Sequence, residues 1–114
     1  LIIPVPLHKK RLAKRGFNQS ELIAHKISGR LNVPLATNVL RRMKNTIPQT
    51  KVAQREKRLE NVKNAFSCAL PEKIKNKTVV LVDDVTTTGA TINECAHALR
   101  EAGAHSVIAF IAAH

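Results

Sequence analysis

Two apolar segments in the second half of the chain constrain the fold more than any other feature. Residues 78–82 read TVVLV, residues 106–113 read SVIAFIAA, and neither contains a charge. Continuous runs rich in β-branched residues are typical of strands buried on both faces of a parallel sheet. Between them, apolar residues recur at helical spacing, at Ile92, Cys95, Ala96 and Leu99. Strand, helix and strand with short connections predict a right-handed parallel unit, and therefore an α/β fold.

The first half of the chain predicts one strand and two loops. Residues 1–6, LIIPVP, are expected to form a short buried strand that its prolines end. Residues 7–17, LHKKRLAKRGF, are expected to form a basic loop with Gly16 at its turn. Residues 39–64 are polar and basic without a clear period, which predicts a long loop with a short helix near its end.

A second helix is expected to begin after Asn18. Asn18 can cap the helix, and Glu21 three residues later is typical of a capping box. The expected helix ends near residues 32–34. Its apolar face is expected to consist of Leu22, Ile23, Ile27 and Leu31.

The length of 114 residues predicts one domain over residues 1–114. Because the sequence opens with Leu1 inside an apolar run, we expect native sequence upstream of it. No apolar stretch is long enough to span a bilayer, and the start does not have the order of a signal peptide. Cys68 and Cys95 are too few and too far apart to indicate a disulfide framework or a zinc site. We therefore expect a cytoplasmic protein without membrane insertion.

Positive charge is concentrated in the first two thirds of the chain. The net charge is +11, but residues 1–77 hold 18 Lys/Arg against 4 Asp/Glu, a net +14, while residues 78–114 hold 1 against 4, a net −3. Such a basic segment favours a polyanion: a phosphorylated small molecule, a nucleic acid or an acidic partner. The alternative is a solvated surface that serves solubility. With three Phe and no Tyr or Trp, stacking of bases on an aromatic platform is poorly supported.

The candidate site is the segment LVDDVTTTGATINE, residues 81–94. Asp83 and Asp84 follow an expected strand, where ligands of open parallel sheets bind. The turn TTTGAT offers small hydroxyls and a glycine, and a helix that starts near Thr91 directs its positive end at the same place, which suits a phosphate. Phosphate and carboxylates together predict a sugar phosphate. A Walker-B reading needs a GxxxxGK[ST] segment, which the chain lacks, and the remaining alternative is purely structural turn chemistry.

The motif VVLVDDVTTTGAT resembles the phosphoribosyl pyrophosphate (PRPP) signature of type I phosphoribosyltransferases. The segment PVPLHKKRLAKRGFNQSELIA, with Thr46, Gln49 and the stretch from Arg58 to Phe66, is similar to the ComF/GntX branch, which is associated with DNA uptake and competence in bacteria. The resemblance implies a mostly parallel, twisted sheet flanked by helices on both faces.

The resemblance also implies roles for individual residues. Asp83 and Asp84 would hold the ribose hydroxyls. The 5′-phosphate would be bound by Thr86, Thr87, Thr88, Gly89 and Thr91. Candidates for the pyrophosphate loop are Arg11, Lys14 and Arg15. Candidates for the flexible catalytic loop are Arg42, Lys44, Thr46, Gln49 and Arg58. Mg²⁺ would arrive with PRPP, without direct protein ligands.

Two functions follow as alternatives. The first is transfer of phosphoribose to a nitrogen acceptor. The second is a non-catalytic adaptor of the competence machinery that binds PRPP, another nucleotide or single-stranded DNA. In this case the basic region would bind the DNA or the competence proteins. Members of the family typically carry an upstream cysteine-rich segment and a variable hood for the base, and the sequence shows neither, so the acceptor is not identified. Small phosphoribosyltransferases often dimerise, so a homodimer is one option for the oligomeric state, which the sequence leaves open.

Overall fold

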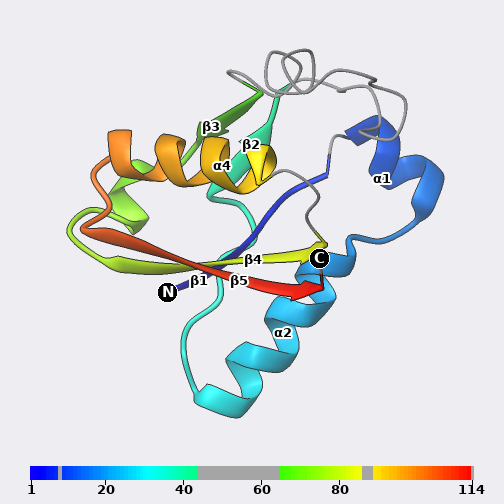
Figure 1. Cartoon of the computed structure of the whole chain (residues 1–114), viewed down its shortest axis with the longest axis horizontal. Coiled ribbons are helices and arrows are strands. Elements are labelled where there is room, and N and C mark those ends of the chain that lie inside the picture. Colours follow the sequence, from blue (N-terminus) through cyan, green and yellow to red (C-terminus); the bar gives the residue numbers. More distant parts are fainter. Residues whose placement is uncertain (8, 44–64, 86–88, 114) are drawn as a thin grey trace.

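A three-stranded parallel sheet forms the centre of the part of the chain that the structure describes. The computed structural model (Figure 1) describes residues 1–7, 9–43, 65–85 and 89–113. The sheet has the order β1–β4–β5, and its strands are β1 (Ile2–Pro4), β4 (Thr78–Val85) and β5 (Ser106–Ala113). In the register, Ile3 lies opposite Leu81, and Leu81 lies opposite Ala109. The three predicted apolar segments are therefore the three strands.

Helices cover both faces of this sheet, as the sequence predicted. Helix α4 (Ala90–Glu101) lies on one face and α2 (Gln19–Leu31) on the other (Figure 1). On the α4 side, Leu81 and Leu99 are fully buried in the larger apolar cluster, and on the α2 side Val82 and Ala24 belong to a smaller one. Alternate residues of β4 thus pack against different helices, which explains its continuous apolar run.

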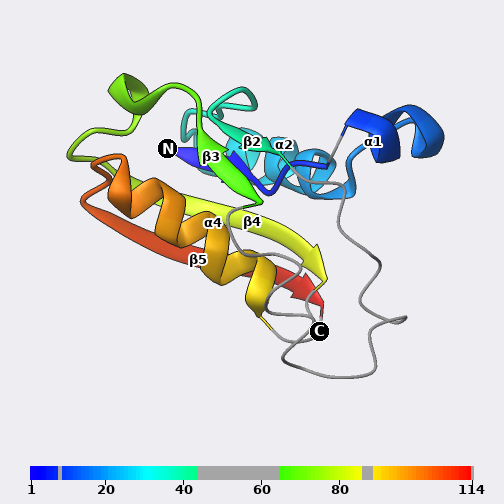
Figure 2. The ribbon, with the colours of Figure 1, turned by 90° about the horizontal axis from the view of Figure 1, so that it is seen from above.

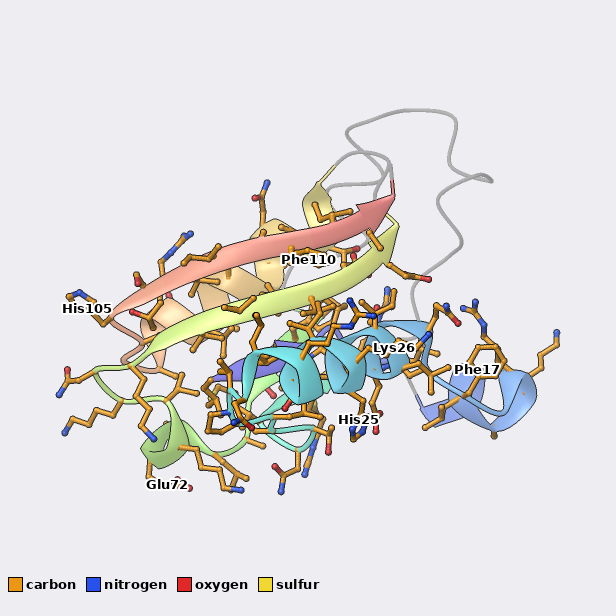
Figure 3. The ribbon with its side chains drawn as sticks, turned by 90° about the horizontal axis from the view of Figure 1, so that it is seen from below. Phe17, His25, Lys26, Glu72, His105 and Phe110 are labelled. Atoms are coloured by element: carbon orange, nitrogen blue, oxygen red, sulfur yellow. The ribbon has the colours of Figure 1, made fainter. Side chains whose placement is uncertain are left out.

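The outer strand β5 is less covered. Seen from the α2 side, Phe110 lies on β5 beyond the helix (Figure 3), and Ile108 and Phe110 are 55% and 45% exposed. Helix α2 covers β1 and β4 instead. No helix among the described residues has the length and apolar character needed to cross a membrane.

The basic segment after β1 is a helix, so the prediction of a loop over residues 7–17 was wrong. Helix α1 spans Lys9–Arg15. Its sequence KKRLAKR consists of strong helix formers without β-branching. It ends at Gly16, which has a φ of 87° and donates its N–H to the Leu12 carbonyl at 2.7 Å. Helix propensity outweighed the charge density from which the loop was inferred.

The start of α2 was predicted correctly, but half of its apolar face was not. Asn18 caps the helix by accepting the Ser20 N–H at 3.0 Å, and Asn32, with a φ of 58°, ends it. Ile23 and Ile27 pack on the sheet as expected, but Leu22 and Leu31 are 47% and 65% exposed. The helix contacts the sheet through the small residues Ser20 and Ala24, which are buried one turn apart.

One short strand lies within the predicted loop over residues 39–64, and a second lies just beyond it. Strand β2 is Leu40–Arg42 and β3 is Phe66–Cys68, with Arg42 antiparallel and opposite Phe66. Strand β3 packs beside α4, β2 pairs with β3 (Figure 2), and the short 3₁₀ helix η2 (Pro71–Lys73) follows. Three-residue strands carry no usable period, and their pairing joins distant segments, so these strands have no local signal in the sequence. The helix expected near the end of residues 39–64 lies outside the described residues.

Asn18 is expected to stabilise the fold in two ways. Besides capping α2, its Nδ2 donates to the Val5 carbonyl at 3.0 Å, at the end of β1. We predict that Asn18→Ala lowers the free energy of unfolding by about 1–2 kcal/mol in urea titrations. Asn18→Ser keeps a capping oxygen but is too short to reach Val5, so it should lose less. Equal losses in both variants would show that the cap itself contributes little.

Candidate functional site

Asp83 and Asp84 lie inside β4, which is longer than predicted. The strand was expected to end at residue 82, but it continues to Val85 because β5 offers partners as far as Ala113. Asp83 lies opposite Ile111 in the register. Both acids are at the carboxyl end of the central strand, the edge at which the sequence placed the site.

The two acids have different surroundings. Asp83 is only 6% exposed, whereas Asp84 is half-buried. Oδ1 of Asp83 accepts the backbone N–H of Asp84 at 2.9 Å and the hydroxyl of Ser20 at 3.2 Å. The same Asp84 N–H also lies 3.2 Å from Ser20 Oγ. Asp83 is therefore hydrogen-bonded to α2 and to the next backbone N–H of its own strand, and Asp84 is the more accessible carboxylate.

The pKa of Asp83 is raised to about 6, in the first place by burial. A hydrogen bond with the Asp84 carboxyl also raises this pKa, while the Asp84 N–H and the Ser20 hydroxyl lower it. The pKa of the nearby Cys95 thiol is raised well above its ordinary value by burial first, and then by the charge of Asp83. The charge of Arg42 opposes that shift. Arg42 on β2, Cys95 on α4 and Asp83 on β4 thus share one electrostatic environment.

The phosphate turn is described only at its end. Thr86, Thr87 and Thr88 lie outside the described residues. Gly89 has a φ of 76° and precedes α4, which begins at Ala90, and Thr91 is half-buried on the first turn. Among the described residues, a Cβ on Gly89 would meet Asn93 Nδ2 alone, at 3.9 Å, and the left-handed backbone itself favours glycine here. The positive end of α4 follows the acids a few residues later in the chain, as predicted.

The predicted pyrophosphate residues lie on α1. Arg11, Lys14 and Arg15 belong to this helix rather than to a loop, beyond the carboxyl end of β1 (Figure 1). Lys14 and Arg15 are exposed, and Cζ of Arg15 lies 5.3 Å from the centre of the Phe17 ring.

Of the predicted catalytic-loop residues, the structure describes only one. Arg42 is half-buried on β2, with its Cζ 5.1 Å from the centre of the Phe66 ring on β3. Lys44, Thr46, Gln49 and Arg58 lie outside the described residues. Arg42 is therefore part of a strand rather than a loop.

Ser20 was missed by the sequence reasoning. It is 3% exposed and contacts both acids, although it is 63 and 64 positions away from them. The only local signal is its position in the first turn of α2, two residues after the cap Asn18. A polar side chain there is ordinarily exposed, and only the packing of α2 on β4 brings it into the site.

The described residues contain no group of three or more His, Cys, Asp or Glu that could hold a metal ion. Mg²⁺ often keeps several waters and binds through substrate phosphates. An ion that arrives with PRPP is compatible with the pair of acids found here, because its main ligands would be oxygens of PRPP itself.

The raised pKa of Asp83 predicts a pH-dependent stability. The folded state binds a proton more tightly than the unfolded state, so this group stabilises the fold below pH 4, and the stability is lost as the pH rises through 6. Asp83→Asn should be more stable than the wild type at pH 7.5 by on the order of 1–3 kcal/mol, and the difference should shrink toward pH 4. Urea titrations across this range measure it.

The control for this prediction is Glu72→Gln, which removes a carboxylate that is exposed on η2. It should show no such trend between pH 4 and 7.5. A difference between Asp83→Asn and the wild type that stays constant over this range would contradict the assignment.

Comparison with known proteins agrees with this geometry. The model of the phosphoribosyl transferase domain family matches residues 18–113. Competence protein F of Haemophilus influenzae is 40% identical over 107 residues, which cover 93% of this chain and 46% of that protein. DNA utilization protein YhgH of Escherichia coli is 38% identical over 106 residues, 93% of this chain and 45% of that protein.

A more distant relative is competence protein ComFC of Bacillus subtilis, 33% identical over 114 residues, which cover 96% of this chain and 42% of that protein. The chain thus spans slightly less than half the length of these relatives. No solved structure matches it at a significant level. The family match covers the capped helix α2, the acid pair and the helix that follows it. The chain therefore belongs to the phosphoribosyl transferase domain family.

Proposed function

We propose that this chain binds PRPP and transfers its phosphoribosyl group to a nitrogen acceptor. The observation that carries the proposal is the acid pair at the carboxyl end of β4, which precedes Gly89 and the N-terminus of α4 by a few residues in the chain. Carboxylates accept the paired hydroxyls of a ribose, and a helix N-terminus favours the phosphate attached to it. A PRPP-dependent role implies a cytoplasmic location.

The two acids would divide the work. Asp84, the more accessible carboxylate, would accept hydrogen bonds from the ribose hydroxyls, and Asp83 would support it from the buried side. Gly89 and Thr91, with Thr86, Thr87 and Thr88, would surround the 5′-phosphate. Such contacts hold the sugar in one orientation while its C1 reacts, and this positioning is a main source of catalysis in transfer reactions.

In the reaction, the bond between C1 of PRPP and the pyrophosphate oxygen breaks, and pyrophosphate leaves with the electron pair. The lone pair of the acceptor nitrogen forms the new bond to C1, and the nitrogen releases its proton to solvent or to pyrophosphate. Positive charges of Arg11, Lys14 and Arg15 suit the departing pyrophosphate. Bound Mg²⁺ would supply further neutralisation of the phosphate oxygens. The acids would also stabilise positive charge on the sugar ring.

Isothermal titration with PRPP and Mg²⁺, together with pyrophosphate release over a panel of nitrogen bases, tests the proposal. Asp84→Asn should weaken binding by at least about tenfold and abolish release, because a charged acceptor is lost. Glu101→Gln removes an exposed carboxylate of α4 and should change neither. If PRPP binds but no base in the panel elicits pyrophosphate, the transferase activity is contradicted while ligand binding stands.

A second function, that of a single-stranded DNA adaptor in DNA uptake, is favoured by α1. This helix exposes Lys14 and Arg15 beside Phe17, in a segment, residues 1–77, whose net charge is +14 from 18 Lys/Arg and 4 Asp/Glu. The names of the relatives, competence protein and DNA utilization protein, point the same way. Exposed cations next to an aromatic ring are typical of surfaces that bind single strands.

Salt dependence tests the adaptor function. Fluorescence anisotropy with a labelled oligonucleotide should show an affinity that falls steeply with added salt. In Lys14→Gln/Arg15→Gln the log–log slope should shrink by about 1.4, for two lost phosphate contacts. Lys75→Gln/Lys77→Gln removes the same charge from exposed positions away from α1 and should change the slope little. A flat salt response in the wild type would contradict this function.

A further inference from the structure

Ser20 and Asp83 are the two polar side chains that the described residues bury in the core, at 3% and 6% exposure, and they hydrogen-bond to each other. The Ser20 hydroxyl donates to Asp83 Oδ1 and accepts the N–H of Asp84, both at 3.2 Å. A third bond, from the Asp84 N–H to Asp83 Oδ1 at 2.9 Å, closes the group. One hydroxyl of α2 therefore contacts both acids of β4.

These hydrogen bonds fix both the Asp83 side chain and the backbone next to it. The bond to Oδ1 selects the orientation of the Asp83 carboxyl, and the bond from the Asp84 N–H fixes the peptide that joins the two acids. The direction of the Asp84 side chain follows from that peptide. A serine hydroxyl can serve as donor and acceptor at once, which alanine and cysteine cannot do with comparable strength.

We propose that Ser20 is a positioning residue for the sugar-binding acids: through one hydroxyl it holds Asp83 and the Asp84 peptide in the geometry that receives ribose hydroxyls. The inference rests on the proposed PRPP binding, since it assigns a role within that site. Ser20 itself would not touch the ligand, because its hydroxyl is occupied by Asp83 and Asp84 and its side chain is buried.

The charges around Asp83 support this role. Asp84 of the same strand raises the pKa of Asp83, Cys95 of α4 is electrostatically coupled to it, and Arg42 of β2 acts on Cys95 with opposite sign. Burial raises the pKa of Asp83, whereas the hydrogen bonds from the Ser20 hydroxyl and the Asp84 N–H lower it. Loss of the hydroxyl should therefore raise this pKa further and leave Asp83 more protonated near neutral pH.

Three variants test the proposal. Ser20→Ala deletes the hydroxyl and suits the second position of a helix. Ser20→Thr restores a hydroxyl with one added methyl. Ser28→Ala is the matched control, because Ser28 donates its hydroxyl to the Val33 carbonyl at 2.6 Å at the other end of the same helix. A merely structural role would make the two alanine variants behave alike.

Titration of PRPP with Mg²⁺ between pH 5.5 and 8.5 gives the first readout. Ser20→Ala should bind about tenfold more weakly at pH 7, as expected for a lost hydrogen bond to a charged group. The midpoint of its pH dependence should move to higher pH, and Ser20→Thr should recover both properties. Ser28→Ala should keep wild-type affinity and midpoint. Wild-type affinity in Ser20→Ala would overturn the proposal.

The second readout needs no ligand. Carboxyl-carbon NMR of the free protein follows the titration of Asp83, which should move to higher pH in Ser20→Ala and stay in place in Ser28→Ala. An unmoved titration would overturn the positioning role. If the wild type binds no PRPP but the titration moves, the proposed function fails and the positioning of Asp83 by Ser20 is supported, so the two failures are distinguishable.

Discussion

A chain of hydrogen bonds joins the carboxyl ends of β1 and β4 to the first turn of α2. Val5 donates its N–H to the Val82 carbonyl at 2.8 Å, Asn18 donates to the Val5 carbonyl, and Asn18 in turn accepts the Ser20 N–H. The Ser20 hydroxyl returns to Asp83, next to Val82. The ring fixes where α2 begins, and it sets the distance between the helix and the two strands. The acids therefore lie beside this ring of hydrogen bonds, at the carboxyl end of β4.

The Asp83 carboxylate at this place lowers the stability of the fold. Desolvation disfavours the ionised form of Asp83, and the second acid beside it adds to the effect. Such an arrangement is typical of functional sites, where residues that bind a ligand lower the stability of the folded protein. On the α4 side, the surrounding core offsets this loss of stability through the fully buried residues Leu81, Cys95 and Leu99.

The parts of the fold that were predicted correctly are those whose signal is local. The strand that begins at Thr78, the face of α4 and the cap Asn18 each follow from periodicity or from the chemistry of a few neighbouring residues. The acid pair was placed for the same reason. Two of the elements that were missed depend on partners far away in the chain: β2 needs β3, and the last residues of β4 need β5. Helix α1 was missed although its signal is local, because a loop was inferred from its charge density. The role of Ser20 depends on the packing of a whole helix.

The pairing of β2 with β3 couples two residues that are far apart in the chain. Because Arg42 lies opposite Phe66, with its guanidinium over the ring, each side chain supports the other through a cation–π contact. Replacing either residue would remove this contact, so the losses of stability in a double variant would be less than additive. The acid pair, which lies on a different strand, would keep its own hydrogen bonds in such variants.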